Sequence, residues 1–547
     1  MSTTPSTAET KKAPMSQSSR TDNEKDPLIR ARREKLQRWR NDLGLAPYGR
    51  RVDGLISLAE ARALFDQSAH DRFGAAVESA KESPDQPVED QRPRALVAGR
   101  CVQHRVMGKL VFMVLRDHSG DLQVSVSKGD LDPTSFKVAS KLDYGDIVVA
   151  GGPVGMTKKG EICIWANRFE VHCKSLVPPP EKYHGLQDAE LRYRQRYVDM
   201  YANPGTLQTF QLRSRLVSQV RRFMDGRGYL EVETPMMQPI AGGAAARPFT
   251  THHNALGMEL YLRIAPELYL KRLLVGGMPR VYEINRNFRN EGVDRSHNPE
   301  FTMMEVYEAF GDYDTMRELT ESLVHELAQT CAEAVPERAA VDGSDPEAPL
   351  ILPFGEINID YTRPFQVVSY GELFERAMGF DMFNREKTRA KATEEHLENA
   401  EKLDHWLLVS ELFDRYGEAE IDPSKPTFVK DFPAAISPLT RPHEENPELS
   451  YRWELFVAGM ELGNSYTELN DPEVQLQKFT EQLAGADEEV QTFRALDEDF
   501  IHALRVGMPP AGGLGVGIDR IIMLMTNATT IRDVILFPLM KFRAVEE

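Results

Sequence analysis

Charged and aromatic residues are concentrated between residues 288 and 307, in FRNEGVDRSHNPEFTMMEVY. This stretch holds two arginines, one histidine and three glutamates around a single glycine and a single proline. The segments at its two ends read as strands, so the pattern predicts a hairpin with a loop from Gly292 to Pro299. A hairpin loop of that length is usually functional, although a sheet face open to water is the alternative.

Alternation along the two strands predicts which side chains share a face. The two sets are Glu283, Asn287, Arg289 and Glu291 on the first strand, and Phe301, Met303, Glu305 and Tyr307 on the second. If the two faces coincide, an arginine, several carboxylates, an aromatic ring and a phenol meet on one surface of a sheet.

A second group lies in GLGVGIDRIIMLMT, residues 513–526, where glycine occupies every second position from Gly513 to Gly517. In a strand this spacing leaves one face without side chains, so a flat ligand can approach the backbone. A helix follows with Arg520 in its first turn, where a cation opposes the helix dipole at a cost of about 0.3–1 kcal/mol. The combination indicates a nucleotide phosphate, whereas a glycine run alone would also fit a bulge or a barrel corner.

A third group lies within residues 452–471, where three glutamates are spaced by sevens: Glu454, Glu461 and Glu468. Strict strand alternation would put Glu461 and Glu468 on opposite faces, and a bulge at Gly463-Asn464 would re-aim the chain. Hard carboxylates suit Mg²⁺, which usually also keeps waters and substrate phosphates. Three solvated glutamates are the alternative interpretation of the same spacing.

The fourth group joins a small-residue loop, GGAAARPF at 242–249, to LRIAPELYLKRLL at 262–274. The loop offers free backbone groups and open space. Pro266 predicts a helix start, with Glu267 in its first turn. A glutamate there is common for dipole reasons alone, but it could also hold an ammonium group.

Composition limits the class of protein. The chain has 547 residues, which predicts two to four domains. Its 66 Lys and Arg against 84 Asp and Glu give a net charge of −18, which argues against non-specific nucleic-acid binding by the whole surface. It has no long apolar run for a membrane span, and its N-terminus has no secretory signal. Four cysteines without a CxxC pair are typical of reduced thiols in a cytoplasmic protein.

The pattern along the chain predicts an α+β protein of several parts. Residues 1–27 are polar and read as a disordered tail, and 28–92 as a helical segment. The helical segment starts with a basic amphipathic helix. This helix could form a local basic face for nucleic acid, or it could be a solvated helix packed on its own protein. Short alternating strands over 93–177 predict a small barrel, of which the OB-fold is one type. Helices mixed with strands fill 178–547, with a helical insertion near 375–410 that includes a charged helix at 385–405.

Taken together, these motifs resemble the class II aminoacyl-tRNA synthetases. The three motifs of that class are similar to the helix and strand that end at Pro235, to FRNEGVDRSHNPEF and to GLGVGIDR. A preceding OB-fold is typical of the subgroup for lysine, aspartate and asparagine. GGAAARPF, RIAPELYLK and ELGNSYTELND are similar to the bacterial lysine-specific members, the lysyl-tRNA synthetases, and the resemblance covers roughly residues 28–545.

The resemblance implies a fold and an activity. The fold is an N-terminal OB-fold β-barrel followed by an antiparallel sheet flanked by helices, in a homodimer. The activity is ATP-dependent ligation of L-lysine to tRNA through a lysyl-adenylate, with Mg²⁺ as cofactor and no membrane partner. Two alternatives stay open: a paralogue that lysylates a protein, although such paralogues lack the OB domain, and a non-catalytic binder of single-stranded nucleic acid.

The resemblance also implies residue roles. The residues implied in catalysis are Arg289 and Arg520. Those implied in ATP binding are Arg289, His297, Phe301 and Arg520. Those implied in amino-acid binding are Gly243, Glu267, Glu291, Tyr307, Asn464 and Glu468. The implied Mg²⁺ ligands are Glu461 and Glu468, with Glu454 a weaker candidate, and the implied anticodon-binding residues of the barrel are Arg105, Phe112 and Gln123.

Overall fold

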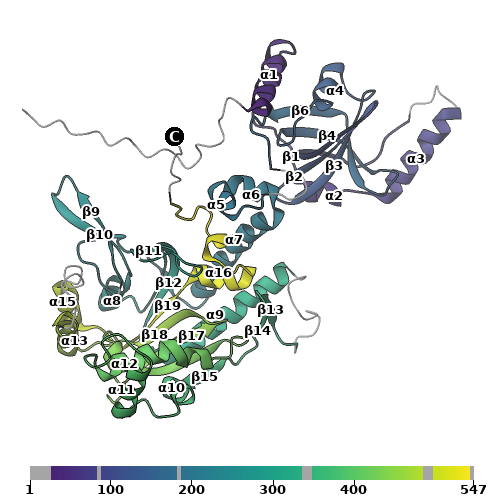
Figure 1. Cartoon of the computed structure of the whole chain (residues 1–547). Helices are drawn as coiled ribbons and strands as arrows, with labels where there is room; N and C mark the ends of the chain where they lie inside the picture. Colours follow the sequence, from purple (N-terminus) through teal and green to yellow (C-terminus); the bar gives the residue numbers. More distant parts are fainter. Residues whose placement is uncertain are drawn as a thin grey trace, which may run out of the picture. The chain divides into compact units, whose positions relative to one another are not determined.

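The structure of the protein is a computed structural model that describes residues 26–82, 88–180, 186–244, 246–335, 348–484 and 497–541. Within these residues the chain forms two compact units (Figure 1). The first runs to Leu207 and includes the chain from Met540, and the second spans Gln208–Leu539. Residues 1–25 of the predicted tail lie outside the described residues. The tail was predicted to reach residue 27, but Pro27 already begins a helix.

The first unit contains a closed β-barrel, as the sequence predicts. Its strands run in the order β1-β2-β3-β5-β4, and β4 pairs back with β1, while β6 adds to β4. Alternate residues such as Val111, Met113 and Leu115 on β2 are buried in its core. The strands are β1 (Arg94–Met107), β2 (Leu110–Asp117), β3 (Gly120–Ser127), β4 (Ile147–Met156), β5 (Ile162–Ala166) and β6 (Arg168–Cys173), with helix α4 (Pro133–Ala139) between β3 and β4.

Helices pack around this barrel. They are α1 (Pro27–Asn41), α2 (Leu58–Ala63), α3 (Gln67–Glu82), α5 (Ala189–Arg194) and α6 (Arg196–Ala202), and α7 (Pro204–Asp225) begins at the end of this unit. The predicted amphipathic helix is α1, which buries Ile29, Leu36 and Trp39, and Trp39 joins the barrel core. Its basic residues are therefore divided between a packed side and a solvent side.

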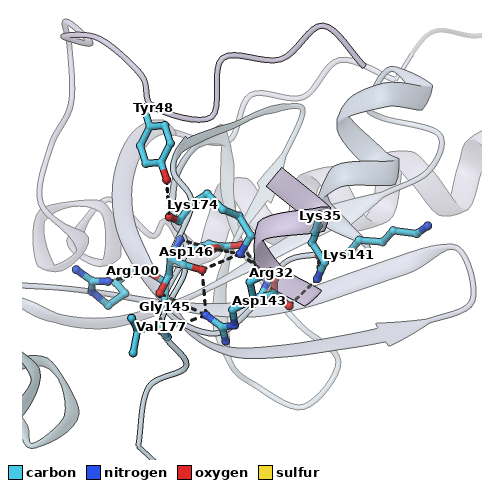
Figure 2. Close-up of polar contacts among 11 residues, drawn as sticks. Arg32, Lys35, Tyr48, Arg100, Lys141, Asp143, Gly145, Asp146, Lys174 and Val177 are labelled. Atoms are coloured by element: carbon cyan, nitrogen blue, oxygen red, sulfur yellow. Dashed lines mark hydrogen bonds and ion pairs between the residues drawn. The ribbon is translucent and has the colours of Figure 1, made fainter. Parts of the chain in front are cut away.

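A buried ion cluster fastens α1 to the barrel (Figure 2). The Lys174 ammonium is fully buried and lies 2.7 Å from Asp146 and 2.8 Å from Asp143. Lys35 of α1 reaches Asp143 at 2.6 Å, and the Arg32 guanidinium donates to the carbonyl oxygen of Ser175 at 3.1 Å. These contacts join the helix, the barrel end and the chain that leaves the barrel.

The second unit is built on an eight-stranded sheet in the order β15-β16-β17-β18-β19-β12-β11-β7. The pairings from β16 to β11 are antiparallel, as predicted, whereas the edge strands β15 and β7 pair parallel with their neighbours. The strands are β7 (Leu230–Glu231), β11 (Arg280–Phe288), β12 (Glu300–Ala309), β15 (Gln366–Ser369), β16 (Thr427–Pro433), β17 (Leu449–Val457), β18 (Met460–Thr467) and β19 (Ala511–Val516).

The two faces of this sheet differ in chemistry. Met304 and Val306 of β12 point into an apolar core with α9 (Tyr313–Ala334) and α16 (Ile518–Thr526), and α9 lies along the sheet in Figure 1. Because side chains alternate, Glu305 and Tyr307 face the other side, where α8 (Glu267–Val275) packs. One face therefore stabilises the unit, and the other is left for polar side chains.

A helical cluster with its own apolar core follows β15. It contains α10 (Tyr370–Met378), α11 (Arg385–Glu394) and α12 (His405–Leu412). The predicted charged helix over 385–405 is wrong in its second half, because α11 ends at Glu394. His396 and Asn399 adopt positive φ angles of 55° and 56°, and Leu397 is buried in the cluster.

The remaining elements of the second unit surround the sheet. They are β8 (Met237–Gln238), β9 (Phe249–His253), β10 (Met258–Leu262), β13 (Ile351–Phe354), β14 (Ile357–Asp360), α13 (Pro472–Ala484), α15 (Glu498–Gly507) and α17 (Ile531–Val534). Among the described helices, none is both long enough and apolar enough to span a bilayer. The described cysteines are all free thiols, three of them buried and Cys173 half-buried.

Candidate active site

The hairpin of β11 and β12 brings the two predicted faces together. Glu283 lies opposite Glu305, and Asn287 lies opposite Phe301. The prediction fails beyond Phe288, because β11 ends there and Glu291 is exposed in the loop. Arg289 also lies past the strand, where its amide donates to the carbonyl of Pro299 at 2.9 Å.

A bulge in β18 re-aims the chain, one residue earlier than predicted. Leu455 of β17 lies opposite Gly463, but the next residue, Phe456, lies opposite Glu461. Leu462 is therefore the additional residue. The bulge turns Glu461 to the side of Asn464, whose amide donates to the Glu461 carboxylate at 3.1 Å.

A cavity of about 430 Å³ opens over the polar face of the sheet. Among the residues that line it are Gly243, Glu267, Arg289, Met303, Glu305, Tyr307, Arg452, Asn464, Tyr466, Gly513 and Gly515. Four of the six residues predicted to bind the amino acid are in this lining, whereas Glu291 is not. A concave pocket with a few convergent polar groups is the usual form of a small-molecule site.

Glu468, the sixth predicted residue, is buried beside this lining. One of its carboxylate oxygens, Oε1, has no hydrogen-bond partner and lies against Gly513, where a Cβ atom would come within 1.8 Å of it. A Cβ there would also lie 2.7 Å from the Tyr307 ring. The glycine at 513 therefore makes room for a carboxylate and a phenol.

Lys271, which the sequence analysis did not single out, bridges two of the predicted carboxylates. Its ammonium lies 2.7 Å from Glu267 and 2.5 Å from Glu468, and it is fully buried. Burial disfavours the charged form, but the two carboxylates outweigh it and raise the pKa of Lys271. The four-residue spacing from Glu267 to Lys271 on one helix was the available signal.

Glu305 was placed on the correct face by the sequence but given no role. It is 4% exposed and lines the cavity. Its nearest hydrogen-bond partner is the Tyr307 hydroxyl at 3.4 Å. Burial, followed by the nearby carboxylates of Glu267 and Glu283, raises the pKa of Glu305 well above its usual range. A carboxylate so destabilised in the empty cavity suits a cationic ligand.

A set of basic and aromatic side chains includes Arg289, which lines the cavity. The Arg289 guanidinium lies 5.2 Å from the centre of the Phe301 ring. Arg520 donates to the carbonyl oxygen of Glu461, and its Nη2 lies 3.0 Å from Nε2 of His297. The Glu461 carboxylate, 3.9 Å from Arg520, supplies part of the anionic compensation that the helix position of this arginine called for.

Asp294 shapes the loop that carries His297. It accepts from the backbone amides of Ser296 and His297 at 2.7 Å, and it lies 2.8 Å from Nδ1 of the His297 ring. Burial opposes ionisation, but these hydrogen bonds hold the pKa of Asp294 at about 2. The loop is thus ordered with His297 turned toward Arg520.

Carboxylates crowd together near Glu461. Burial and the Glu461 charge raise the pKa of Glu454 to about 7 against the opposing effect of Arg452. Burial, Asp414 and Glu461 raise that of Glu418 to about 7 as well. The described residues form no cluster of three ligating side chains close enough for a metal. A pair of carboxylates completed by phosphate oxygens and water fits Mg²⁺.

Glu468 is in a different environment from this pair. The charges that act on it most strongly are those of Lys271 and Glu267. The predicted pairing of Glu461 with Glu468 as metal ligands stays a prediction, whereas the charge of Glu461 acts directly on Glu454. Glu468 itself lies with the carboxylates around the cavity.

The three predicted residues of the barrel share its outer face. Arg105 of β1 lies opposite Phe112 of β2, and its guanidinium is 5.8 Å from the ring centre. Gln123 of β3 lies opposite Val114, so it faces the same side as Phe112. Phe112 is half-buried and stands outside the apolar core of the barrel.

Comparison with known proteins identifies the family. The family of class II tRNA synthetases for D, K and N matches residues 188–541, and an OB-fold nucleic acid binding domain matches 95–178. A lysine–tRNA ligase of Carboxydothermus hydrogenoformans is 44% identical over 522 residues, which cover 95% of this chain and 99% of the relative. The chain belongs to the lysine–tRNA ligase family. A lysine–tRNA ligase of Escherichia coli is 46% identical over 452 residues, 81% of this chain and 86% of the relative.

Membership of the lysine–tRNA ligases confirms the resemblance seen in the sequence. The first class motif lies on α7 and the short strand β7, the second on the β11–β12 hairpin, and the third on β19 and α16. In this ligase fold β12 pairs directly with β19, so the second and third motifs are adjacent. The OB-fold is present as predicted, and the synthetase sheet is antiparallel as predicted except at its two parallel edge strands.

Proposed function

We propose that this protein ligates L-lysine to its cognate tRNA with ATP, through a lysyl-adenylate. The observation that carries the proposal is the group of buried carboxylates, Glu305 and Glu468, beside the Tyr307 hydroxyl at a cavity that Arg289 also lines. Buried carboxylates that keep an oxygen without a cationic partner favour a ligand with a cationic side chain, and an arginine favours its carboxylate. A lysine molecule has both features.

The residues in and beside the cavity lining suit the three charged groups of lysine: the α-ammonium, the carboxylate and the ε-ammonium. Glu267 and the backbone of Gly243 accept the α-ammonium group, and Asn464 and Arg289 hold the carboxylate. Glu468, Glu305 and Tyr307 receive the ε-ammonium group. Sites built on such polar contacts reject analogues that lack the matching group by about 10⁴ or more.

ATP is proposed to occupy the region beside Arg289. The adenine ring stacks on Phe301, and His297 and Arg520 neutralise the phosphates. Glu454 and Glu461 would hold Mg²⁺, which supplies further neutralisation of phosphate charge. Crowding of these two carboxylates, which raises the pKa of Glu454, supports that assignment.

The chemistry needs two anions to approach each other. The lysine carboxylate attacks the α-phosphorus of ATP in line, the bond to pyrophosphate breaks, and lysyl-adenylate forms. The 3′-terminal ribose hydroxyl of tRNA then attacks the lysyl carbonyl carbon, and AMP leaves. Arg289 lies between the two reactants and neutralises both, so catalysis rests on positioning and charge stabilisation.

The barrel is proposed to bind the anticodon of tRNA. Its outer face carries an aromatic ring, an arginine and an amide, which suit stacking and hydrogen bonding to unpaired bases. The presence of the barrel favours tRNA over a protein as the acceptor. The chain carries the residue types expected at the catalytic positions, which favours an enzyme over an inactive binder. A two-fold homodimer and a cytoplasmic location belong to the same proposal.

One assay series tests the proposal. ATP–pyrophosphate exchange is measured with each of the twenty amino acids, and transfer of labelled lysine to bacterial tRNA is measured separately. We expect exchange with lysine alone and stable charging of tRNA. Exchange with aspartate or asparagine, or lysine transfer to a protein acceptor and not to tRNA, would contradict it.

A further inference from the structure

Two carboxylates of the proposed lysine pocket come from distant parts of the chain. Glu267 begins α8, and Glu468 directly follows β18. Their side chains are 5% and 1% exposed, so water hydrates neither carboxylate to any extent. Something in the protein must fix their separation if the pocket is to fit one amino acid.

Lys271 is the group that contacts both. Its ammonium touches Oε1 of Glu267 at 2.7 Å and Oε2 of Glu468 at 2.5 Å. Among the described residues, no other cation forms an ion pair with either carboxylate. Each carboxylate has a second oxygen atom. That of Glu468, Oε1, is buried, has no hydrogen-bond partner and lies against Gly513 beside the cavity.

Lys271 itself is poorly placed to touch a ligand. It is fully buried and is absent from the cavity lining. Its ammonium lies 6.0 Å from the centre of the Phe500 ring, within the apolar layer of α8 and α15. A buried lysine held by two acids is rigid, because moving it would leave three uncompensated charges.

We propose that Lys271 is a positioning residue that fixes the separation of the Glu267 and Glu468 carboxylates, so that the pocket selects the length of the amino-acid side chain. This inference rests on the proposed function, in which Glu267 receives the α-ammonium group and Glu468 the ε-ammonium group. One oxygen of each carboxylate is bound to Lys271, and the other is the proposed contact to the substrate. Ornithine, shorter by one methylene, cannot reach both.

The test compares Lys271→Met and Lys271→Arg with the wild-type enzyme in ATP–pyrophosphate exchange, using lysine and ornithine. Lys271→Met removes the bridge, and Lys271→Arg keeps the charge but moves the carboxylates apart. We expect both variants to raise KM for lysine by ~10-fold or more, as loss of a charge-assisted contact does. Preference for lysine over ornithine should fall by a similar factor, with KM for ATP within about threefold.

The matched control is Lys174→Met in the barrel unit. Lys174 is also fully buried between two acids, Asp143 and Asp146 (Figure 2), but it lies in the other unit. This variant should keep the wild-type lysine and ornithine parameters in exchange, which separates a pocket effect from the general cost of removing a buried lysine. Thermal melts of all variants show whether they fold.

The outcomes separate the two proposals. If folded Lys271 variants keep the wild-type preference for lysine over ornithine, or bind lysine more tightly, Lys271 does not set the length of the pocket. A parallel loss with both amino acids and with ATP would show a purely structural role and would also overturn the inference. Failure of the wild-type enzyme to activate lysine would instead overturn the proposed function.

Discussion

At the residue scale, Arg520 is held in the orientation that a phosphate ligand requires. Its guanidinium is fixed by the Glu461 carbonyl oxygen and by His297. We expect Arg520→Ala to slow lysine-dependent exchange by ~10²–10³, as loss of a preorganised donor does. The fold and tRNA binding should be unchanged.

The control for this variant is Arg505→Ala on α15, which removes an exposed arginine paired with Glu473. It should exchange at the wild-type rate. Exchange at the wild-type rate by folded Arg520→Ala would contradict the phosphate role.

Glu305 gives a second prediction at this scale. Burial and nearby carboxylates raise the pKa of Glu305, so its protonated form must lose a proton before the ionised carboxylate can bind a lysine ammonium. Lysine affinity should therefore increase as pH rises through the raised pKa of Glu305. Calorimetry in buffers of different ionisation enthalpy should detect proton release that Glu305→Gln reduces. Absence of proton release in the wild type would contradict the coupling between lysine binding and the raised pKa of Glu305.

Single residues were predictable to the extent that their chemistry was local. Glu267 and Tyr307 were found from helix and strand patterns and Asn464 from the family resemblance, and all three line the cavity. The spacing of Lys271 from Glu267 was a local signal, but its second partner Glu468 lies on a distant element, and no local pattern reveals that contact. The environment of Glu468 beside Lys271 was hidden from the sequence for the same reason.

At the element scale, the glycines of β19 fit the side chains of the strands beside them. A Cβ at Gly513 would collide with the Glu468 carboxylate, and the nearest side-chain atom to a Cβ at Gly371 is 3.5 Å away. Gly513→Ala should raise KM for lysine by ~10-fold or more, because the carboxylate must move from its position. Gly371→Ala in α10, where the added Cβ meets only ordinary contact distances, should match the wild type.

Kinetic measurements with lysine and ATP decide this prediction. A folded Gly513→Ala enzyme with a wild-type KM for lysine would show that Glu468 can move without loss, so it would not be a substrate contact. An increase in KM for ATP alone would assign the glycines from Gly513 to Gly517 to the nucleotide site, as their spacing in the sequence indicated.

Elements were predicted well where periodicity decides them. The β11–β12 hairpin, the barrel strands and the helix after β19 all follow the sequence pattern. The helix over 385–405 was overextended because its charges continue past Glu394, whereas the break depends on Leu397 turning into a core. The bulge was placed one residue late, because register is set by the neighbouring strand.

At the scale of the whole molecule, amino-acid activation and tRNA recognition are assigned to different units. Phe112 stands on the outer face of the barrel and contacts no part of the apolar core. Phe112→Ala should weaken tRNA charging by about 1–3 kcal/mol through lost base stacking. Lysine-dependent exchange, which needs only the second unit, should be preserved.

The two assays on this one variant serve as control for each other. Parallel loss of exchange and charging would mean that Phe112 supports the fold and not the anticodon. A normal KM for tRNA would place the anticodon elsewhere on the barrel.

The central claim is that buried carboxylates recognise the side-chain ammonium of lysine. The most direct measurement is ATP–pyrophosphate exchange by the wild-type enzyme with lysine and with norleucine, which has no side-chain ammonium. The proposal predicts that lysine supports exchange and that norleucine is disfavoured in kcat/KM by about 10⁴ or more. Comparable kcat/KM values for the two amino acids would contradict it.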